Sequence, residues 1–151
     1  MSIPERVRHI FLAPQQSYTA VEAAELLGWR VAEIDVAIRE GDLEATRTCS
    51  GHRIAWQEVA AMLTAQYPHA VIEQALGKAA SSVMPELVRL AELRVDIPRY
   101  QTVMLGKLAE RANMSIDEFL SRHLLDLAGA ESDWLNKAIP QFGAAMRWPE
   151  P

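Results

Sequence analysis

The sequence has a single cysteine, no long hydrophobic run and no excess of positive charge. Cys49 cannot form a disulfide within the chain. A small domain without disulfides is more typical of the reducing cytoplasm than of secreted proteins, so we expect a cytoplasmic protein. No run approaches the ~20 apolar residues of a membrane-spanning helix, so we expect no membrane partner. The 15 Lys and Arg residues against 20 Asp and Glu give a net charge of −5. Any affinity for nucleic acid therefore has to come from local basic patches.

The sequence also lacks the common motifs of enzymes. No glycine-rich phosphate loop precedes a helix, no nucleophile elbow is present, and the carboxylates lie mostly beside basic partners on polar helix faces. Cys49 and His52 have a Cys-x-x-His spacing, but a zinc site needs four ligands and the other histidines lie in unrelated segments. We therefore predict no catalytic residues, no metal and no cofactor.

The composition is that of a folded protein. Of the 151 residues, 50% are apolar and 23% are charged, which excludes a wholly disordered chain, a collagen-like chain and a simple coiled coil. The length suits one domain or two small modules. The N-terminal stretch around Arg6 and Arg8 has too short an apolar part for a signal peptide, and we expect it to be a leading arm.

Residues 1–66 are predicted to form a first module of short helices separated by glycine. Thr19 and Glu22 have the spacing of a capping box, which predicts a helix that ends at Gly28. A second helix is expected to end at Gly41. Its apolar residues recur at helical spacing, namely Val31, Ile34 and Ile38.

A hairpin and a third helix complete this module. β-Forming residues surround a turn at residues 49–51, and the expected inward side chains are Leu43, Ala45 and Ile54. A helix is expected to begin near Trp56. Residues 67–91 then show short helical patterns and are predicted to form a helical connector.

The second half of the chain begins with an alternating pattern. Leu93, Val95 and Ile97 fall on one face of a predicted strand that Pro98 stops. A helix ending at Asn113 follows, and residues 115–118 form a second capping box before another helix. Residues 92–128 thus run strand, helix, turn, helix.

Residues 18–28, 38–43 and 51–54 resemble the excisionase-type winged helix-turn-helix, a relative of the MerR-type domain. The resemblance covers residues 17–63. It implies a DNA reader with residues 30–40 in the major groove and the hairpin as a wing on the backbone or the minor groove. The residues then expected to contact DNA are Arg30, Arg39, Arg47, Thr48, His52 and Arg53.

The outward face of residues 30–40 departs from this pattern. Burial of the apolar stripe turns small apolar and acidic residues outward, together with one cation: Ala32, Glu33, Val36, Arg39 and Glu40. Contacts to bases and phosphates rely instead on Arg, Lys, Asn and Gln. Two interpretations remain open, a DNA reader that depends on its wing and a domain reused to bind protein. The hairpin cations likewise fit either nucleic-acid contact or a solvated tip.

Residues 92–128 resemble the ribbon-helix-helix family, in which two chains pair their single strands and interlock their helices. A lone strand leaves backbone groups unpaired, and two short helices cannot cover its apolar face, so we predict a homodimer through Leu93, Val95 and Ile97. The resemblance implies DNA contacts from Arg94 and from the helix start at Ser115.

The fold class is thus expected to be mainly α with short β: a winged helix-turn-helix, a helical connector and a ribbon-helix-helix dimerisation module. The tail, residues 129–151, carries Trp134, Phe142 and Trp148, which we expect to dock on the dimer or on a partner. The leading hypothesis is a dimeric transcriptional regulator that binds operator DNA. A small regulator with a ribbon-helix-helix dimer core and an aromatic tail also resembles the antitoxins of toxin-antitoxin pairs, which bind their operator and wrap the toxin with the tail. The alternative is an interaction adaptor whose helix-turn-helix has lost DNA binding and docks a partner protein.

Overall fold

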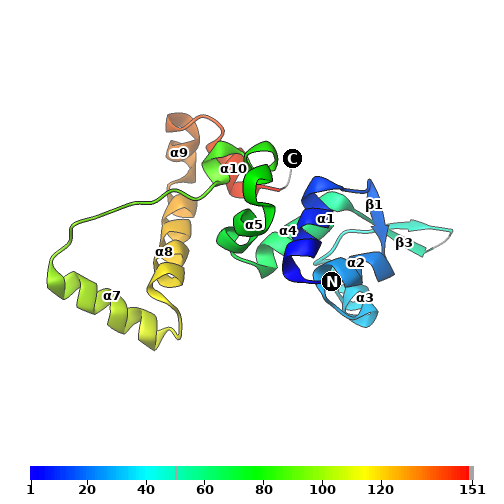
Figure 1. The fold of residues 1–151 in the computed structure, drawn as a ribbon, viewed down its shortest axis with the longest axis horizontal. Coiled ribbons are helices and arrows are strands. Elements are labelled where there is room, and N and C mark those ends of the chain that lie inside the picture. Colours follow the sequence, from blue (N-terminus) through cyan, green and yellow to red (C-terminus); the bar gives the residue numbers. More distant parts are fainter. Residues whose placement is uncertain (50, 150–151) are drawn as a thin grey trace. The chain divides into compact units, whose positions relative to one another are not determined.

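The computed structural model describes residues 1–49 and 51–149. This part of the chain is mainly helical and contains a three-stranded antiparallel sheet, which confirms the expected mainly α class with short β (Figure 1). It divides into two compact units. The first comprises residues 1–90 together with the end of the chain from residue 144, and the second comprises residues 91–143.

The first unit contains most of the secondary structure. Its elements are α1 (Ile3–Leu12), β1 (Ser17–Thr19), α2 (Ala20–Leu27), α3 (Val31–Glu40), β2 (Thr46–Thr48), β3 (Gly51–Ala55), α4 (Trp56–Gln66), α5 (His69–Leu76), the 3-10 turn η1 (Gly77–Ala79), α6 (Ala80–Val83) and the 3-10 turn η2 (Glu86–Val88). They enclose one hydrophobic core.

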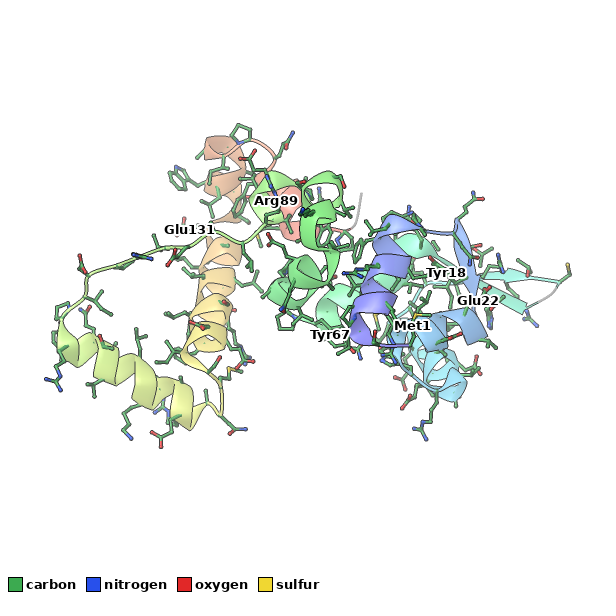
Figure 2. The ribbon with its side chains drawn as sticks, in the orientation of Figure 1. Met1, Tyr18, Glu22, Tyr67, Arg89 and Glu131 are labelled. Carbon is green, nitrogen blue, oxygen red and sulfur yellow. The ribbon has the colours of Figure 1, made fainter. Side chains whose placement is uncertain are left out.

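The ends of α2 and α3 follow the sequence prediction. Glu22 N–H donates to Thr19 Oγ1 at 3.3 Å, and Thr19 N–H donates to the Glu22 carboxylate at 2.7 Å, which completes the predicted capping box (Figure 2). Gly28 and Gly41 cap the two helices with φ of +74° and +85°, a left-handed backbone that favours glycine. A side chain at Gly28 would also collide with the guanidinium of Arg6.

The N-terminal stretch is a helix, and the prediction of a leading arm was wrong. Val7, Ile10 and Phe11 of α1 are buried in the core of the first unit. Their i, i+3, i+4 spacing places them on one face of a helix. Arg8 Nε donates to the carbonyl of Ala75 at 2.8 Å and ties α1 to α5.

The sheet has the strand order β1-β3-β2. The hairpin β2–β3 was expected, and Ile54 and Leu43 are buried as predicted, while Ala45 is half-buried. Strand β1 was not predicted because three residues are too few to show alternation. It holds Tyr18 fully buried opposite Ile54. The edge strand thereby fixes the base of the hairpin to the helices.

Residues 67–90, predicted as a connector, contribute to the core of the first unit. Ile72, Leu76 and Met84 are buried there. The second unit then contains α7 (Arg99–Arg111), α8 (Ile116–Ala130) and α9 (Ser132–Ala138), and α10 (Phe142–Arg147) begins at its end. Asn113 adopts a left-handed φ of 55° between α7 and α8, where the sequence predicted a helix end.

The strand predicted at residues 92–97 is absent from the described chain. Residues 91–98 form no regular element, and Leu93 and Val95 are 81% and 62% exposed. A strand is stable only when its backbone pairs with another strand, and the single chain supplies none here. The expected ribbon therefore requires a second molecule.

Candidate functional site

The hairpin presents two basic residues at its outer end. Arg47 of β2 lies directly opposite His52 of β3 in the antiparallel ladder, and both residues are exposed. Directly opposed residues project from the same face of a sheet, so their side chains form one basic pair. Figure 1 shows the hairpin reaching beyond the helices of the first unit. Thr48, also predicted to contact DNA, donates its hydroxyl to the carbonyl of Gly51 at 2.6 Å and shapes the turn.

Arg53, the third predicted cation of the hairpin, is held by β1. Its Nε and Nη2 atoms donate to the hydroxyl and carbonyl oxygens of Ser17, each at 3.2 Å. The side chain is half-buried and cross-links the neighbouring strands. Its guanidinium charge stays at the base of the hairpin, while two of its donor groups are already engaged.

Arg30, predicted to contact DNA at the start of α3, is paired within the helix. Its Nη2 atom lies 2.9 Å from Glu33 Oε1, and its backbone N–H donates to Glu33 Oε2 at 2.7 Å. The side-chain hydrogen bond from Arg30, followed by the backbone bond, lowers the pKa of the Glu33 carboxyl. Arg30 and Glu33 together therefore carry no net charge at this end of α3. Arg39 is exposed in the last turn of α3.

A shallow groove of about 330 Å³ lies along α3, and we name it the α3 groove. Its lining is apolar and acidic, and comprises Trp29, Glu33, Val36, Ala37, Glu40 and Asp42. Trp29 is half-buried, packs against the core of the first unit and borders this groove. The sequence predicted acidic and apolar residues on the outward face of α3. The depth of the groove depends on how the turn between α2 and α3 packs against α3, which the sequence does not show. A second hollow of about 430 Å³ has no charged residue in its lining: Pro14, Gln15, Gln16, Ala55, Trp56 and Gln57.

The predicted phosphate site of the second unit is already filled by a carboxylate. Ser115 donates its backbone N–H and its hydroxyl to Glu118 Oε2 at 2.8 Å and 2.9 Å. These two hydrogen bonds lower the pKa of the Glu118 carboxyl, the backbone bond having the larger effect. Asp117 adds a second acid to the first turn of α8. Arg94, the other predicted contact, pairs with Glu92 at 3.0 Å.

The second unit leaves most of its large apolar side chains in water. Ala109 is the one buried hydrophobic residue between residues 91 and 143, a segment that the structure describes completely. Apart from Trp134, the exposed large hydrophobic residues of this segment, which we name the apolar surface, are Leu93, Val95, Ile97, Tyr100, Val103, Met104, Ile116, Leu120, Leu124, Leu125 and Leu127. A surface of this extent is typical of a protein interface.

The three aromatic residues of the tail have different surroundings. Trp134 of α9 is 65% exposed, and Phe142 is half-buried. Trp148 is half-buried and stacks on Phe11, with ring centroids 5.1 Å apart and an interplanar angle of 14°. The imidazole of His69 lies tilted at 5.8 Å from the same indole. The end of the chain therefore belongs to the packing of the first unit.

The described residues contain no group of three or more His, Cys, Asp and Glu side chains placed to hold a metal ion. Among the same residues, no helix is both long and apolar enough to cross a membrane. Comparison of the chain with protein-family models, curated proteins and solved structures gives no match. The hairpin, the α3 groove and the apolar surface are therefore the candidate functional features of the described chain.

Proposed function

We propose that the protein is a dimeric, DNA-binding transcriptional regulator whose first unit is a winged helix-turn-helix. The observation that carries the proposal is the basic pair of Arg47 and His52 on a hairpin that follows two helices joined by a glycine turn. In this class of protein the hairpin is the wing, which contacts the DNA backbone or the minor groove. The guanidinium of Arg47 is suited to phosphate oxygens, and an imidazole N–H of His52 is a hydrogen-bond donor for the same oxygens.

The charges of α3 favour a wing-led mode of binding. Arg30 forms an ion pair with Glu33, and the exposed Arg39 is followed by two acids, Glu40 and Asp42, at the end of the helix. Carboxylates repel phosphates, so insertion of this face into a major groove is unfavourable. Arg47 and His52 are attached to a different element and meet the backbone without bringing these acids close to it. We therefore assign the main DNA contacts to the wing, with Arg53 supporting its base.

The apolar surface supports dimerisation. Burial of each large apolar side chain stabilises a protein by roughly 1.5–3 kcal/mol, whereas a whole domain is stable by only about 5–15 kcal/mol. A unit with Ala109 as its buried hydrophobic residue cannot reach that stability by itself. In the proposed dimer, residues 91–98 of two chains pair as an antiparallel ribbon, and α7 and α8 of both chains cover it. Leu93, Val95 and Ile97 then become core.

The antitoxin-like specialisation requires a tail that binds a second protein. Trp148 is engaged with Phe11, so within the described tail the exposed indole of Trp134 is the aromatic group best placed for a partner. A toxin bound by this tail is a further partner under the proposal. The alternative is an adaptor whose helix-turn-helix has lost DNA binding and docks a partner protein through a different surface, the face of α3.

A gel-shift titration at low salt tests the proposal. The full-length protein is mixed with duplex DNA from upstream of its own gene, and the protein-to-DNA stoichiometry is measured by sedimentation. We expect a complex with two chains per duplex that weakens steeply as salt rises. Absence of any complex at low salt would remove the DNA-binding function and leave the adaptor.

A further inference from the structure

Residues 91–98 combine an apolar face with a charged face, and both faces are exposed. In an extended segment, alternate residues lie on opposite faces. The apolar residues are Leu93, Val95 and Ile97. The charged residues between them are Glu92, Arg94 and Asp96. Within the described residues, no hydrogen bond joins the backbone of residues 91–97 to another group. The backbone and the apolar face of this segment are therefore available to a second strand.

The neighbouring elements limit the length of such a strand. The backbone N–H of Leu90 donates to the Glu73 carboxylate of α5 at 2.7 Å, and Arg89, whose Nε atom is buried, also belongs to the first unit. Helix α7 begins at Arg99, directly after Pro98. Pairing with a second copy of the chain is therefore confined to residues 91–98.

The two-fold symmetry of a homodimer leaves few registers for this pairing. One residue must lie opposite its own copy, because an axis between two residues would place apolar residues opposite charged ones. An axis at Arg94 or at Asp96 places that charge opposite itself, and like charges directly opposite destabilise a ladder. An axis at Leu93 places Ile97 opposite Arg89, outside the free segment. An axis nearer either end leaves most of the segment unpaired.

We propose that the ribbon is centred on Val95 and that Arg94 of each chain pairs with Asp96 of the partner subunit. The pairing rests on the dimer of the proposed function. In this register Val95 lies opposite its own copy, and Leu93 lies opposite the partner's Ile97, so each apolar residue faces another apolar residue. On the charged face, Arg94 and Asp96 of both chains form a square. Each charge in the square has opposite charges as its neighbours along and across the strands, which stabilises the ladder.

Pro98 determines which opposed residues lie closest. In an antiparallel ladder, pairs that exchange two hydrogen bonds alternate with pairs that exchange none. Pro98 has no N–H, so it fits only a pair of the second kind. Arg94 and Asp96 lie an even number of residues away and fall in the same kind of pair. In such pairs the Cα atoms approach to about 4.5 Å and the side chains are nearest to each other.

The pairing gives Arg94 a role other than DNA contact. In the single chain its Nε atom lies 3.0 Å from Glu92 Oε1. The partner's Asp96 adds a second carboxylate in the dimer. The charged face of the ribbon then carries one cation and two acids from each chain. This face repels phosphates, so DNA contact is left to the wing.

Charge exchange between two full-length variants tests the pairing. Arg94→Asp places acid opposite acid in its homodimer, and Asp96→Arg places cation opposite cation, whereas one chain of each restores two opposite-charge pairs. Native mass spectrometry measures the dimers in each sample and in the mixture. We expect each homodimer to dissociate at least about tenfold more readily than wild type. In the mixture, about nine-tenths of the dimers should contain one chain of each variant, against about one half for random association. Recovery of dimers on mixing separates loss of pairing from misfolding.

The matched control exchanges the same charges on α3. Arg39→Asp and Asp35→Arg alter exposed residues of the first unit, and their mixture should associate at random. Random association of the ribbon variants, or an equal preference in the control, would overturn the pairing and leave the dimer. An Asp96→Arg homodimer as stable as wild type would indicate a different register and would also overturn it. A monomeric wild type would overturn the dimer and the pairing together.

Discussion

The indole of Trp148 stacks on the ring of Phe11 with their centroids 5.1 Å apart, so the segment around Trp148 packs against helix α1. Phe11 is buried, and Trp148 covers it from the outside. Stacked aromatic pairs contribute about 0.5–1.5 kcal/mol beyond the burial of their area. The contact makes the C-terminal segment a structural part of the first unit.

Replacement of Trp148 by alanine should therefore destabilise the protein. We expect Trp148→Ala to lower the free energy of unfolding by about 1–3 kcal/mol and the melting temperature by several degrees. Trp134→Ala is the matched control, because Trp134 is 65% exposed and its loss should change the melting temperature little. Differential scanning calorimetry measures both. An unchanged melting temperature for Trp148→Ala would argue that the stacked pair does not stabilise the unit.

A charge in the predicted ribbon should disrupt the dimer. Val95→Asp would place an unpaired carboxylate in the shared core, which costs several kcal/mol, and we expect a monomeric or unfolded second unit. Val21→Asp is the control, because Val21 is 64% exposed on α2 and outside the proposed interface. Light scattering at micromolar concentration gives the mass of each. A dimer that survives Val95→Asp unchanged, or a monomeric wild type with a cooperative melting transition, would refute the ribbon.

The start of α8 should matter for stability and not for DNA. Ser115 is the N-cap of α8, so Ser115→Ala should lower the free energy of unfolding by about 1 kcal/mol. The affinity for duplex DNA should stay the same, because the Glu118 carboxylate already accepts the hydrogen bonds that a phosphate would need. Denaturant unfolding and DNA titration of one preparation measure the two effects. A weaker DNA complex with unchanged stability would restore Ser115 as a phosphate contact.

The capping box of α2 predicts a pH dependence. Hydrogen bonds from the backbone and hydroxyl of Thr19 lower the pKa of the Glu22 carboxyl below that in the unfolded chain. The carboxylate therefore stabilises the folded state above the ordinary glutamate pKa of about 4.3, and this contribution is lost as the pH falls below it. Wild type should exceed Glu22→Gln in free energy of unfolding at neutral pH, and the gap should close in acid. A gap that is independent of pH would contradict this origin.

The predictable parts of the fold were those that depend on neighbouring residues. Thr19 and Glu22, Gly28, and Ser115 and Glu118 lie within one turn of the structure they determine, so their spacing was sufficient. Helix α1 was not predicted, although Val7, Ile10 and Phe11 have helical spacing, because it packs on residues far along the chain, such as Ala75 of α5, that no local pattern links to it.

Features that depend on distant residues could not be obtained in this way. Arg53 and Ser17 meet because β1 pairs with β3, and no local pattern links them. Trp29 borders the α3 groove because the turn after α2 packs beside α3, and no local pattern shows this contact. The ribbon proposed at residues 91–98 requires a second chain, and in the single chain this segment forms no regular element.

The most direct test of the central claim is the salt dependence of DNA binding. Each phosphate contact contributes about 0.9 to the slope of log affinity against log salt for duplex DNA, so Arg47→Ala should weaken binding and reduce the slope by about one such step for each wing in contact. Lys78→Ala, an exposed cation of the first unit away from the hairpin, should leave both unchanged. Fluorescence anisotropy between about 50 and 200 mM salt gives the slopes. A slope that stays the same in Arg47→Ala, or falls equally in Lys78→Ala, would contradict a DNA reader led by its wing.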